Sequence, residues 1–280
     1  MSSLYSVWKN VNQIDNWTIS GDSIAGIRTS FFLHDLKIQL DAGHQSFNNI
    51  STIFITHTHA DHIASLPLII LENISNKVIT SVYCPEESRK HLENMIDSFL
   101  ACNYNNYNIP KKYYNIYGFN TNYLLELKLN NKDIVIQAFN SDHTVPTLSY
   151  GFIERKKKLK DEFIGLNSRE IVQLKNDKVE ITKIVHNKNI VFCGDTSINI
   201  FENNPGILEY KNIIIECTFF EESDLPLAIE RKHMHWSQLK PIIESNINVN
   251  FYLIHVSAKY HDKDLIKSII GDEISNVFFL

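Results

Sequence analysis

The chain has 280 residues, of which 44% are hydrophobic and 21% are charged, and its formal net charge is −5. This length suits one large domain or two small ones, and the composition is ordinary for a globular protein with a sizeable core. The negative net charge argues against a protein that coats nucleic acid through general basicity, although it leaves room for a local basic patch.

The cysteines and the absence of long apolar runs bear on the compartment. The four cysteines are widely spaced and form no CxxC pair, which is typical of buried thiols in a reducing compartment. Residues 1–10 lack the basic-then-apolar pattern of a secretory signal. No apolar run approaches the ~18 residues that a membrane helix needs. We therefore expect a soluble, cytoplasmic protein that makes no use of a membrane.

Hydrophobic patterning in the first half of the chain predicts mainly strands. They are expected at 24–33, 36–41, 50–56, 78–83, 122–129 and 133–140, with Asn130-Asn131 as a hairpin turn between the last two. Helices are expected at 62–73 and from Pro85 to about residue 100, because proline suits the first helical turn. The Asn- and Tyr-rich stretch 101–120 predicts a loop with a short strand near 113–117.

The second half alternates strands with helices. Strands are expected at 149–153, 189–193, 212–216, 250–254 and 277–279, and helices at 161–175, 235–245 and 261–270. A basic run, Arg155 to Lys160, lies within an insert-like segment at 154–186. The order of the elements predicts an α/β (α+β) fold: one domain over residues 1–280, with two packed sheets and helices outside them.

The most informative stretch is THTHADH at residues 56–62, which gathers three imidazoles and one carboxylate between two apolar runs. On an extended strand end His57 and His59 point to the same side, whereas Asp61 and His62 begin a turn into a helix. One pair could hold one metal ion and the other pair a second. Imidazole and carboxylate suit zinc, and also manganese or iron, and two neighbouring metals suit displacement at phosphorus or carbonyl centres. The alternative is a solvated, histidine-rich turn.

Three later strands end in residues of the same kinds. His143 follows the strand 133–140, Asp195 follows 189–193, and His255 follows 250–254. A lone histidine at a strand end is usually a hydrogen-bonded turn residue. Taken together with the first cluster, these three residues predict a metal site built on one rim of a sandwich.

These seven residues resemble the metal site of the metallo-β-lactamase fold. The resemblance implies a four-layer αββα sandwich that binds two Zn²⁺ per subunit, with Mn²⁺ as a substitute. It implies one metal on His57, His59 and His143, the other on Asp61, His62 and His255, and Asp195 bridging both. A hydroxide between the metals would be the nucleophile.

Further motifs are similar to those of ribonuclease Z, the tRNA 3′-processing endonuclease, in its short form. They are DHTVP at 142–146 with SYGF at 149–152, CGDT at 193–196, ECTF at 216–219, HWSQ at 235–238 and HVSAKY at 255–260. The resemblance runs from about residue 20 to the C-terminus. It departs from the family at Ala64-Ser65, where Gly-Gly is frequent, at Trp236, and at Lys259, where arginine is usual. The Lys259 change removes bidentate phosphate recognition at that position.

The resemblance also nominates residues for proton transfer. His235 would protonate the leaving oxygen, oriented and kept cationic by Glu216, and Asp61 could help to deprotonate the attacking water. Without the resemblance, Glu216 is a strand-end carboxylate and His235 a polar residue at a helix N-terminus. Six histidines have no companion residues and are interpreted as surface or turn residues: His34, His44, His91, His186, His233 and His261.

Substrate contacts are predicted from charge and position. Ser257 and Lys259, beside His255, are candidate phosphate contacts, and the basic side chains Arg155, Lys156, Lys157 and Lys158 could contact RNA phosphates. In isolation the basic run is a solvated face. Asp41 could hydrogen-bond the histidine cluster, or could be an ordinary turn carboxylate.

The function implied is a zinc-dependent endoribonuclease that removes the 3′ trailer from pre-tRNA. It would leave a tRNA 3′-hydroxyl and a 5′-phosphomonoester, and the family usually forms homodimers. One alternative is a phosphodiesterase of the same fold acting on another substrate, such as a cyclic nucleotide. Another is a non-catalytic RNA-binding relative, against which the complete set of seven ligands speaks.

Overall fold

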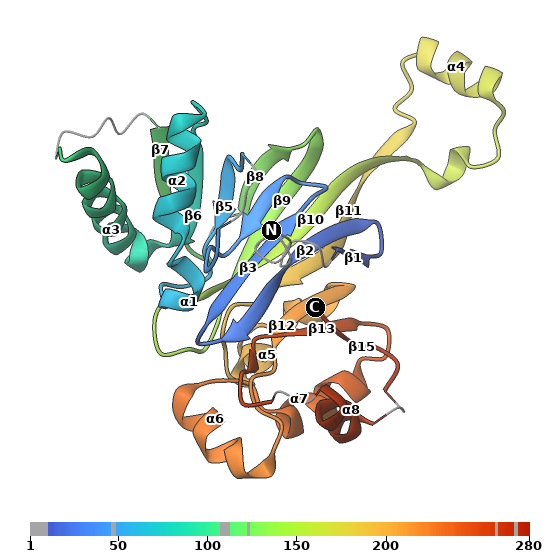
Figure 1. Cartoon of the computed structure of the whole chain (residues 1–280). Coiled ribbons are helices and arrows are strands. Elements are labelled where there is room, and N and C mark those ends of the chain that lie inside the picture. The colour runs from blue at the N-terminus through green and yellow to red at the C-terminus, as the bar shows by residue number, and fades with distance from the viewer. Residues whose placement is uncertain (1–10, 46–48, 107–112, 122–123, 261–262, 272–273) are drawn as a thin grey trace.

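The computed structural model describes residues 11–45, 49–106, 113–121, 124–260, 263–271 and 274–280. Within these residues two β-sheets pack face to face and helices lie on both outer surfaces (Figure 1). This four-layer arrangement confirms the predicted αββα sandwich.

The first sheet pairs its strands in the order β1-β2-β3-β4-β5-β6-β7, with β14 added beside β2. Its strands are β1 (Val11–Ile14), β2 (Trp17–Ala25), β3 (Arg28–Leu33), β4 (Ile38–Leu40), β5 (Thr52–Phe54), β6 (Thr80–Pro85), β7 (Tyr114–Phe119) and β14 (Val256–Ser257). The second sheet runs β15-β13-β12-β11-β10-β9-β8. Its strands are β8 (Leu124–Leu129), β9 (Lys132–Asn140), β10 (Leu148–Leu159), β11 (Thr182–Phe192), β12 (Asn212–Glu216), β13 (Asn250–Ile254) and β15 (Val277–Phe279).

The helices divide between the two outer faces. The α-helices are α1 (Ala60–Ile63), α2 (Leu66–Ser75), α3 (Glu86–Tyr104), α4 (Ser168–Asn176), α5 (Asn199–Asn203), α6 (Leu225–Arg231), α7 (Trp236–Ser245) and α8 (Lys263–Ile270). Short 3-10 helices cover η3 (Asp161–Phe163), η4 (Pro205–Glu209) and η5 (Glu222–Asp224). Helices α1 to α3 bury apolar side chains against the first sheet, and α5, α7 and α8 against the second.

The layer between the sheets is an apolar core with many aromatic rings. Phe31, Phe54, Phe152 and Phe192 are fully buried there, together with Trp17. Strands that bury both faces in this way read as continuous apolar runs, and they bring the polar residues that follow them to one rim of the sandwich.

The predicted boundaries were wrong in two places in the first half. The single strand expected at 24–33 is a hairpin, because the chain turns at Gly26 (φ +69) and Ile27 N donates to Ile24 O at 3.0 Å. The helix expected at 62–73 is two helices, because Ala64-Ser65 separates α1 from α2 and Pro67 lies in the first turn of α2. The Asn130-Asn131 hairpin is confirmed, with φ values of +47 and +66.

The segment 154–186 forms an arm. Strands β10 and β11 continue past the sandwich and carry α4 away from the body of the molecule (Figure 1). Residues 155–159 of the basic run therefore lie within strand β10. The helix expected at 161–175 is the shorter α4 preceded by η3, and the strand expected at 189–193 is the end of the much longer β11. Helix α4 begins at Ser168, where Asn167 accepts from two backbone N–H groups in a capping box.

Some predictions fall partly outside the described residues. Positions 107–112 of the predicted loop, 122–123 of the predicted strand and 261–262 of the predicted helix lie there, so the placement of His261 is not described. Strand β1 and helices α5 and α6 had no counterpart among the predicted elements. In the part of the chain that the structure describes, no helix has the length and apolar character needed to cross a lipid bilayer.

Candidate metal and phosphodiester site

The first four predicted ligands lie on the loop between β5 and the end of α1. His57 is fully buried, and His62 is buried in α1. The ring centroid of His57 lies 4.7 Å from that of His59 and 4.0 Å from that of His62. Asp61 faces the turn between β2 and β3, where its Oδ2 accepts from the Gly26 backbone N–H at 2.9 Å.

Asp41 holds this loop in place through hydrogen bonds. It is fully buried after β4 in the left-handed region (φ +56), which asparagine and aspartate tolerate better than most residues. Its carboxylate accepts from the Thr56 backbone N–H at 2.7 Å and bonds to His62 Nδ1 at 2.8 Å. Of the two roles that the sequence left open for Asp41, the structure therefore supports hydrogen bonding with the histidine cluster. Because Nδ1 of His62 is engaged, its Nε2 is the nitrogen left to face the cluster.

The second sheet supplies the remaining ligands from its strand ends. His143 follows β9, Asp195 follows β11, and His255 follows β13. All three are buried. His255 has φ +59, a left-handed conformation that turns the chain out of β13 at the ligand itself.

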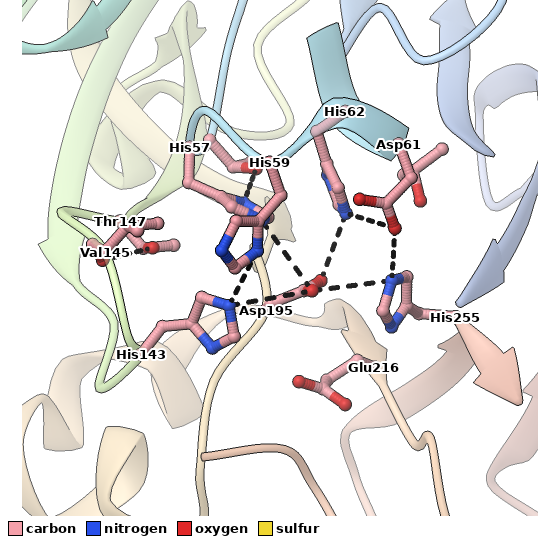
Figure 2. Close-up of polar contacts among 12 residues, drawn as sticks. His57, His59, Asp61, His62, His143, Val145, Thr147, Asp195, Glu216 and His255 are labelled. Atoms are coloured by element: carbon pink, nitrogen blue, oxygen red, sulfur yellow. Dashed lines mark hydrogen bonds and ion pairs between the residues drawn. The ribbon is translucent and has the colours of Figure 1, made fainter. Parts of the chain in front are cut away.

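The Asp195 carboxylate is the centre of the arrangement (Figure 2). Its oxygens lie 3.4 Å from His62 Nε2, 3.4 Å from His255 Nε2 and 3.7 Å from His57 Nε2. Figure 2 shows His57, His59 and His143 on one side of Asp195, and Asp61, His62 and His255 on the other. The ligand atoms of each trio lie within 4.8 Å of one another, and Asp195 belongs with the first trio by the same criterion. The seven residues predicted from the sequence thus lie together in the predicted grouping.

The donor set fits divalent cations. Among the described residues, His57 Nε2 and His62 Nε2 are buried without a hydrogen-bond partner, although both face the cluster. Buried polar atoms of this kind are costly unless a ligand satisfies them. Asp41, Asp61 and Asp195 place carboxylates around the same histidines. Imidazole nitrogen and carboxylate oxygen together are a donor set that suits zinc and similar metals.

The electrostatics follow from this crowding. Burial and the neighbouring His62 hold the pKa of His57 well below its ordinary value, so that ring is neutral. Burial opposes the charge on His62, but Asp195 and Asp41 outweigh it and raise the pKa of His62 to about 9. Burial favours the protonated form of Asp195, but His255 and His62 hold its pKa far below the ordinary range. The site is therefore rich in carboxylate charge that a cation would neutralise.

Glu216, at the end of β12, is paired with His233 and not with His235. Its Oε1 bonds to His233 Nδ1 at 2.8 Å, and its Oε2 accepts from Thr218 Oγ1 at 2.5 Å. His233 also lies near the cluster, with Nδ1 3.9 Å from an Asp195 oxygen. Burial lowers and Glu216 raises the pKa of His233, with a net result of about 9.

The predicted His235–Glu216 pair is wrong. His235 Nδ1 accepts from the Ser237 backbone N–H at 3.1 Å, and His235 Nε2 donates to the Glu221 carbonyl oxygen at 2.9 Å. This residue caps the N-terminus of α7, as in the alternative considered from the sequence. His233 was missed because it follows a short helix and no apolar strand. Its spacing from His235, two residues in the loop that precedes α7, was the available signal.

Three of the residues predicted to contact substrate, Lys259, Arg155 and Lys156, are already paired with carboxylates. Lys259 forms ion pairs with Glu221, at 3.3 Å, and with Asp224. Arg155 makes two hydrogen bonds to Glu126, at 2.7 and 2.8 Å, and one to Asp133. Lys156 pairs with Glu154 at 2.8 Å. Lys157 and Lys158 are exposed on β10, and Ser257 lies in β14, two residues after His255.

Comparisons with known proteins show what this chain resembles. A family model described as anti-Pycsar protein Apyc1 matches residues 25–269. The chain is 29% identical over 263 residues to tRNase Z TRZ1 of Arabidopsis thaliana, covering 92% of this chain and 91% of that protein. It is 25% identical to the chloroplastic tRNase Z TRZ2 of the same plant, covering 92% of this chain and 72% of that protein.

Solved structures support the fold. The metallo-β-lactamase fold protein YhfI from Bacillus subtilis aligns with a TM-score of 0.62 at 13% identity, over 92% of this chain and 93% of that one. The short form of human tRNase Z aligns with a TM-score of 0.55 at 14% identity, over 92% and 94%. The resemblance to ribonuclease Z within the metallo-β-lactamase fold is thus confirmed, and by its family model the chain belongs to the family of the anti-Pycsar protein Apyc1.

Proposed function

We propose that the protein is a zinc-dependent endoribonuclease that removes the 3′ trailer from pre-tRNA and leaves a tRNA 3′-hydroxyl. The observation that supports phosphodiesterase activity is the cluster of seven candidate metal ligands, with the Glu216–His233 pair beside it. The pre-tRNA substrate is supported by the similarity to tRNase Z over 92% of the chain.

The proposed division of the metal-binding residues is the one that the resemblance implies. His57, His59 and His143 would hold one Zn²⁺, and Asp61, His62 and His255 the other, with Asp195 shared between them. Mn²⁺ is a substitute with the same preference for nitrogen and oxygen donors. When bound, divalent cations supply positive charge against the phosphate oxygens and acidify water.

The residues of the chain then handle the proton on the leaving side. His233, held as a cation by Glu216, donates its proton to the 3′ oxygen that leaves with the tRNA. Glu216 is itself held by Thr218 Oγ1 and by the backbone N–H groups of Thr196 and Met234. This fixed carboxylate keeps the His233 ring in one orientation. On the attacking side, Asp61 is ionised and accepts a hydrogen bond from water.

The arm favours a large anionic substrate. Residues 154–186 contain nine Lys and Arg against six Asp and Glu, in a chain whose net charge is −5. Arg155 and Lys156 are already paired with carboxylates, so Lys157 and Lys158 are the exposed cations of the basic run. We assign RNA backbone contacts to those two residues first, and to Arg155 and Lys156 only after exchange of their carboxylate partners.

The test is cleavage of a 3′-extended pre-tRNA by purified protein supplied with zinc or manganese, with both product ends mapped. We expect one cut after the acceptor stem, a 3′-hydroxyl on the tRNA and a 5′-phosphate on the trailer. Asp61→Ala should abolish cleavage. An inactive wild-type protein with both metals, or an Asp61→Ala protein as active as the wild type, would contradict the proposal.

A second substrate class has support of its own. The matching family model is described by an anti-Pycsar protein and not by a tRNA-processing enzyme. Lys259, which stands where ribonuclease Z usually has arginine, is bound by two carboxylates. A phosphodiesterase acting on cyclic nucleotides is the alternative, and a panel of cyclic nucleotides assayed beside pre-tRNA separates the two.

Assembly and location complete the proposal. We propose a homodimer in the cytoplasm, as the similarity to ribonuclease Z and the cysteine pattern suggest. Light scattering of the purified protein measures the first of these directly.

A further inference from the structure

A cavity of about 720 Å³ lies beside β14, outside the metal cluster. One wall is formed by the end of β2 and the β2–β3 turn, including Ile24 and Ile27. The lining also includes Val256 of the adjacent β14, together with Tyr260 and Phe279. The volume falls in the range of small-molecule sites, roughly 300–1,000 Å³. Ile27 and Phe279 are 53% and 41% exposed, so apolar side chains are left open to an incoming ligand.

Two segments that line the cavity are next to residues of the metal cluster. Val256 and Ser257, which line it, directly follow the predicted ligand His255 and pair with Ile24 and Ala25 of β2. On the other side, Gly26 lies between the lining residues Ile24 and Ile27 and donates its N–H to Asp61 Oδ2 at 2.9 Å. A phosphodiester held at the cluster would therefore carry its substituent to the edge of this cavity.

The lining combines apolar surface with a few polar groups. Asp22, Ser23 and Ser257 offer a carboxylate and two hydroxyls among the aliphatic and aromatic side chains. The Asp22 charge is compensated by Arg28, whose guanidinium lies 2.5 Å from Oδ2. A compensated carboxylate can accept hydrogen bonds near a phosphodiester with little repulsion of its charge.

We propose that this cavity receives the nucleoside attached to the scissile phosphate, with the base against the apolar walls and the polar groups bonded to base edge or ribose. This inference rests on the proposed phosphodiesterase activity and adds a recognition site to it. A flat heteroaromatic ring with polar edges matches such a lining, because its faces need apolar contact and its edges need hydrogen bonds.

The test compares two chromogenic phosphodiesters that release the same p-nitrophenolate. One is thymidine 5′-(p-nitrophenyl phosphate) and the other is methyl p-nitrophenyl phosphate, which lacks the nucleoside. The wild-type protein loaded with zinc should prefer the thymidine probe in kcat/KM. Ile27→Trp, which fills the cavity, and Phe279→Ala, which removes part of a wall, should each lower the ratio of the two kcat/KM values about tenfold. Ile247→Trp is the matched control, because Ile247 is 75% exposed and lies between α7 and β13.

The outcomes separate this inference from the proposed function. If the wild-type protein hydrolyses neither probe, the phosphodiesterase proposal fails. If it hydrolyses both but the ratio is unchanged in Ile27→Trp and in Phe279→Ala, only the nucleoside cavity is overturned. The same two variants assayed on pre-tRNA and on cyclic nucleotides identify the source of the nucleoside, since kcat/KM should fall for the substrate class that uses the cavity.

Discussion

His233 and His235 lie two positions apart and have different partners. His233 faces Glu216 and Asp195, whereas the two ring nitrogens of His235 are used by Ser237 and the Glu221 carbonyl. We expect His233→Ala to lower kcat by about 10²- to 10⁴-fold, the range for loss of a general acid. His235→Asn, which retains a capping side chain, should keep kcat and lose stability instead. Rates and thermal melting temperatures of the two variants check this, and a His235→Asn protein that melts normally but is inactive would restore the original assignment.

The pH dependence is also decided at single residues. Since the pKa of His233 is raised from 6.5 to about 9, the ring holds its proton at neutral pH and loses it as pH rises through about 9. The rate should therefore fall above about pH 9. Glu216→Gln removes the carboxylate that raises this pKa, so the alkaline limb should move toward pH 6.5. The measurement is kcat against pH for both proteins, and an alkaline limb at the same pH in both would exclude His233 as the acid.

The sequence predicted the position of polar site residues well where they follow directly after an apolar strand. His143, Asp195 and His255 each come just after such a strand, so sequence alone placed them at one rim. His233 has no such context, since it follows Lys232, which is in the left-handed region (φ +55) at the end of α6. Choosing between His233 and His235 depends on which ring faces Glu216 in the folded chain, and local sequence does not contain that information.

At the scale of elements, the turn after β4 holds the loop of residues 56–62 in place. Asp41 bonds both Thr56 and His62 while in a left-handed conformation. Asp41→Asn tolerates that backbone and removes only the charge. We expect metal affinity to fall about 10- to 100-fold, as for other partners of ligating histidines. Titration of the metal-free protein with zinc against a chromogenic chelator measures it, and unchanged affinity would limit Asp41 to a role in folding.

The outer part of the arm, residues 161–180, can be removed without breaking a sheet. Lys160 N donates to Ile181 O at 2.9 Å, so these two residues already close the ladder below α4. Replacing residues 161–180 by Asn-Gly removes three Lys and Arg and five Asp and Glu and keeps Lys157 and Lys158, so KM for pre-tRNA should keep its salt dependence. Adding Lys157→Ala and Lys158→Ala to that variant should raise KM about tenfold or more and weaken the salt dependence. Turnover of methyl p-nitrophenyl phosphate is the internal control. Equal losses on both substrates would mean that the arm supports the fold and not RNA binding.

Two strand boundaries show where prediction from hydrophobic patterning fails. The end of β2, the turn and β3 were predicted as one strand at 24–33, because the turn, Ala25-Gly26-Ile27, includes apolar residues that continue the run. The strand predicted at 149–153 was too short because β10 continues through charged residues, which have no buried face to mark them as strand. In both places the pairing partner decides the structure, and pairing is a long-range property.

At the scale of the whole molecule, metal binding should couple to stability. Asp195 and His62 are buried together with Asp41, and Asp61 lies beside them, so several carboxylates surround one buried imidazole. Binding at a concentration of 1,000 times Kd adds about 4 kcal/mol, which for a chain of this size is roughly 10 °C in Tm. Thermal unfolding with zinc and after chelation checks this, with Asp195→Asn as a variant that should respond little to zinc. A wild-type Tm indifferent to chelation would argue against tight binding.

The seven predicted ligands come from both sheets, four from the loop after β5 and three from strand ends of the second sheet. Neither sheet alone can assemble a complete donor set. We therefore expect each cation to be fully held only once the two sheets have packed together, unlike the metal of a zinc finger, whose ligands come from one small unit. Loading becomes a step in the life of the enzyme after synthesis, so supply of metal can regulate how much of a folded population is active.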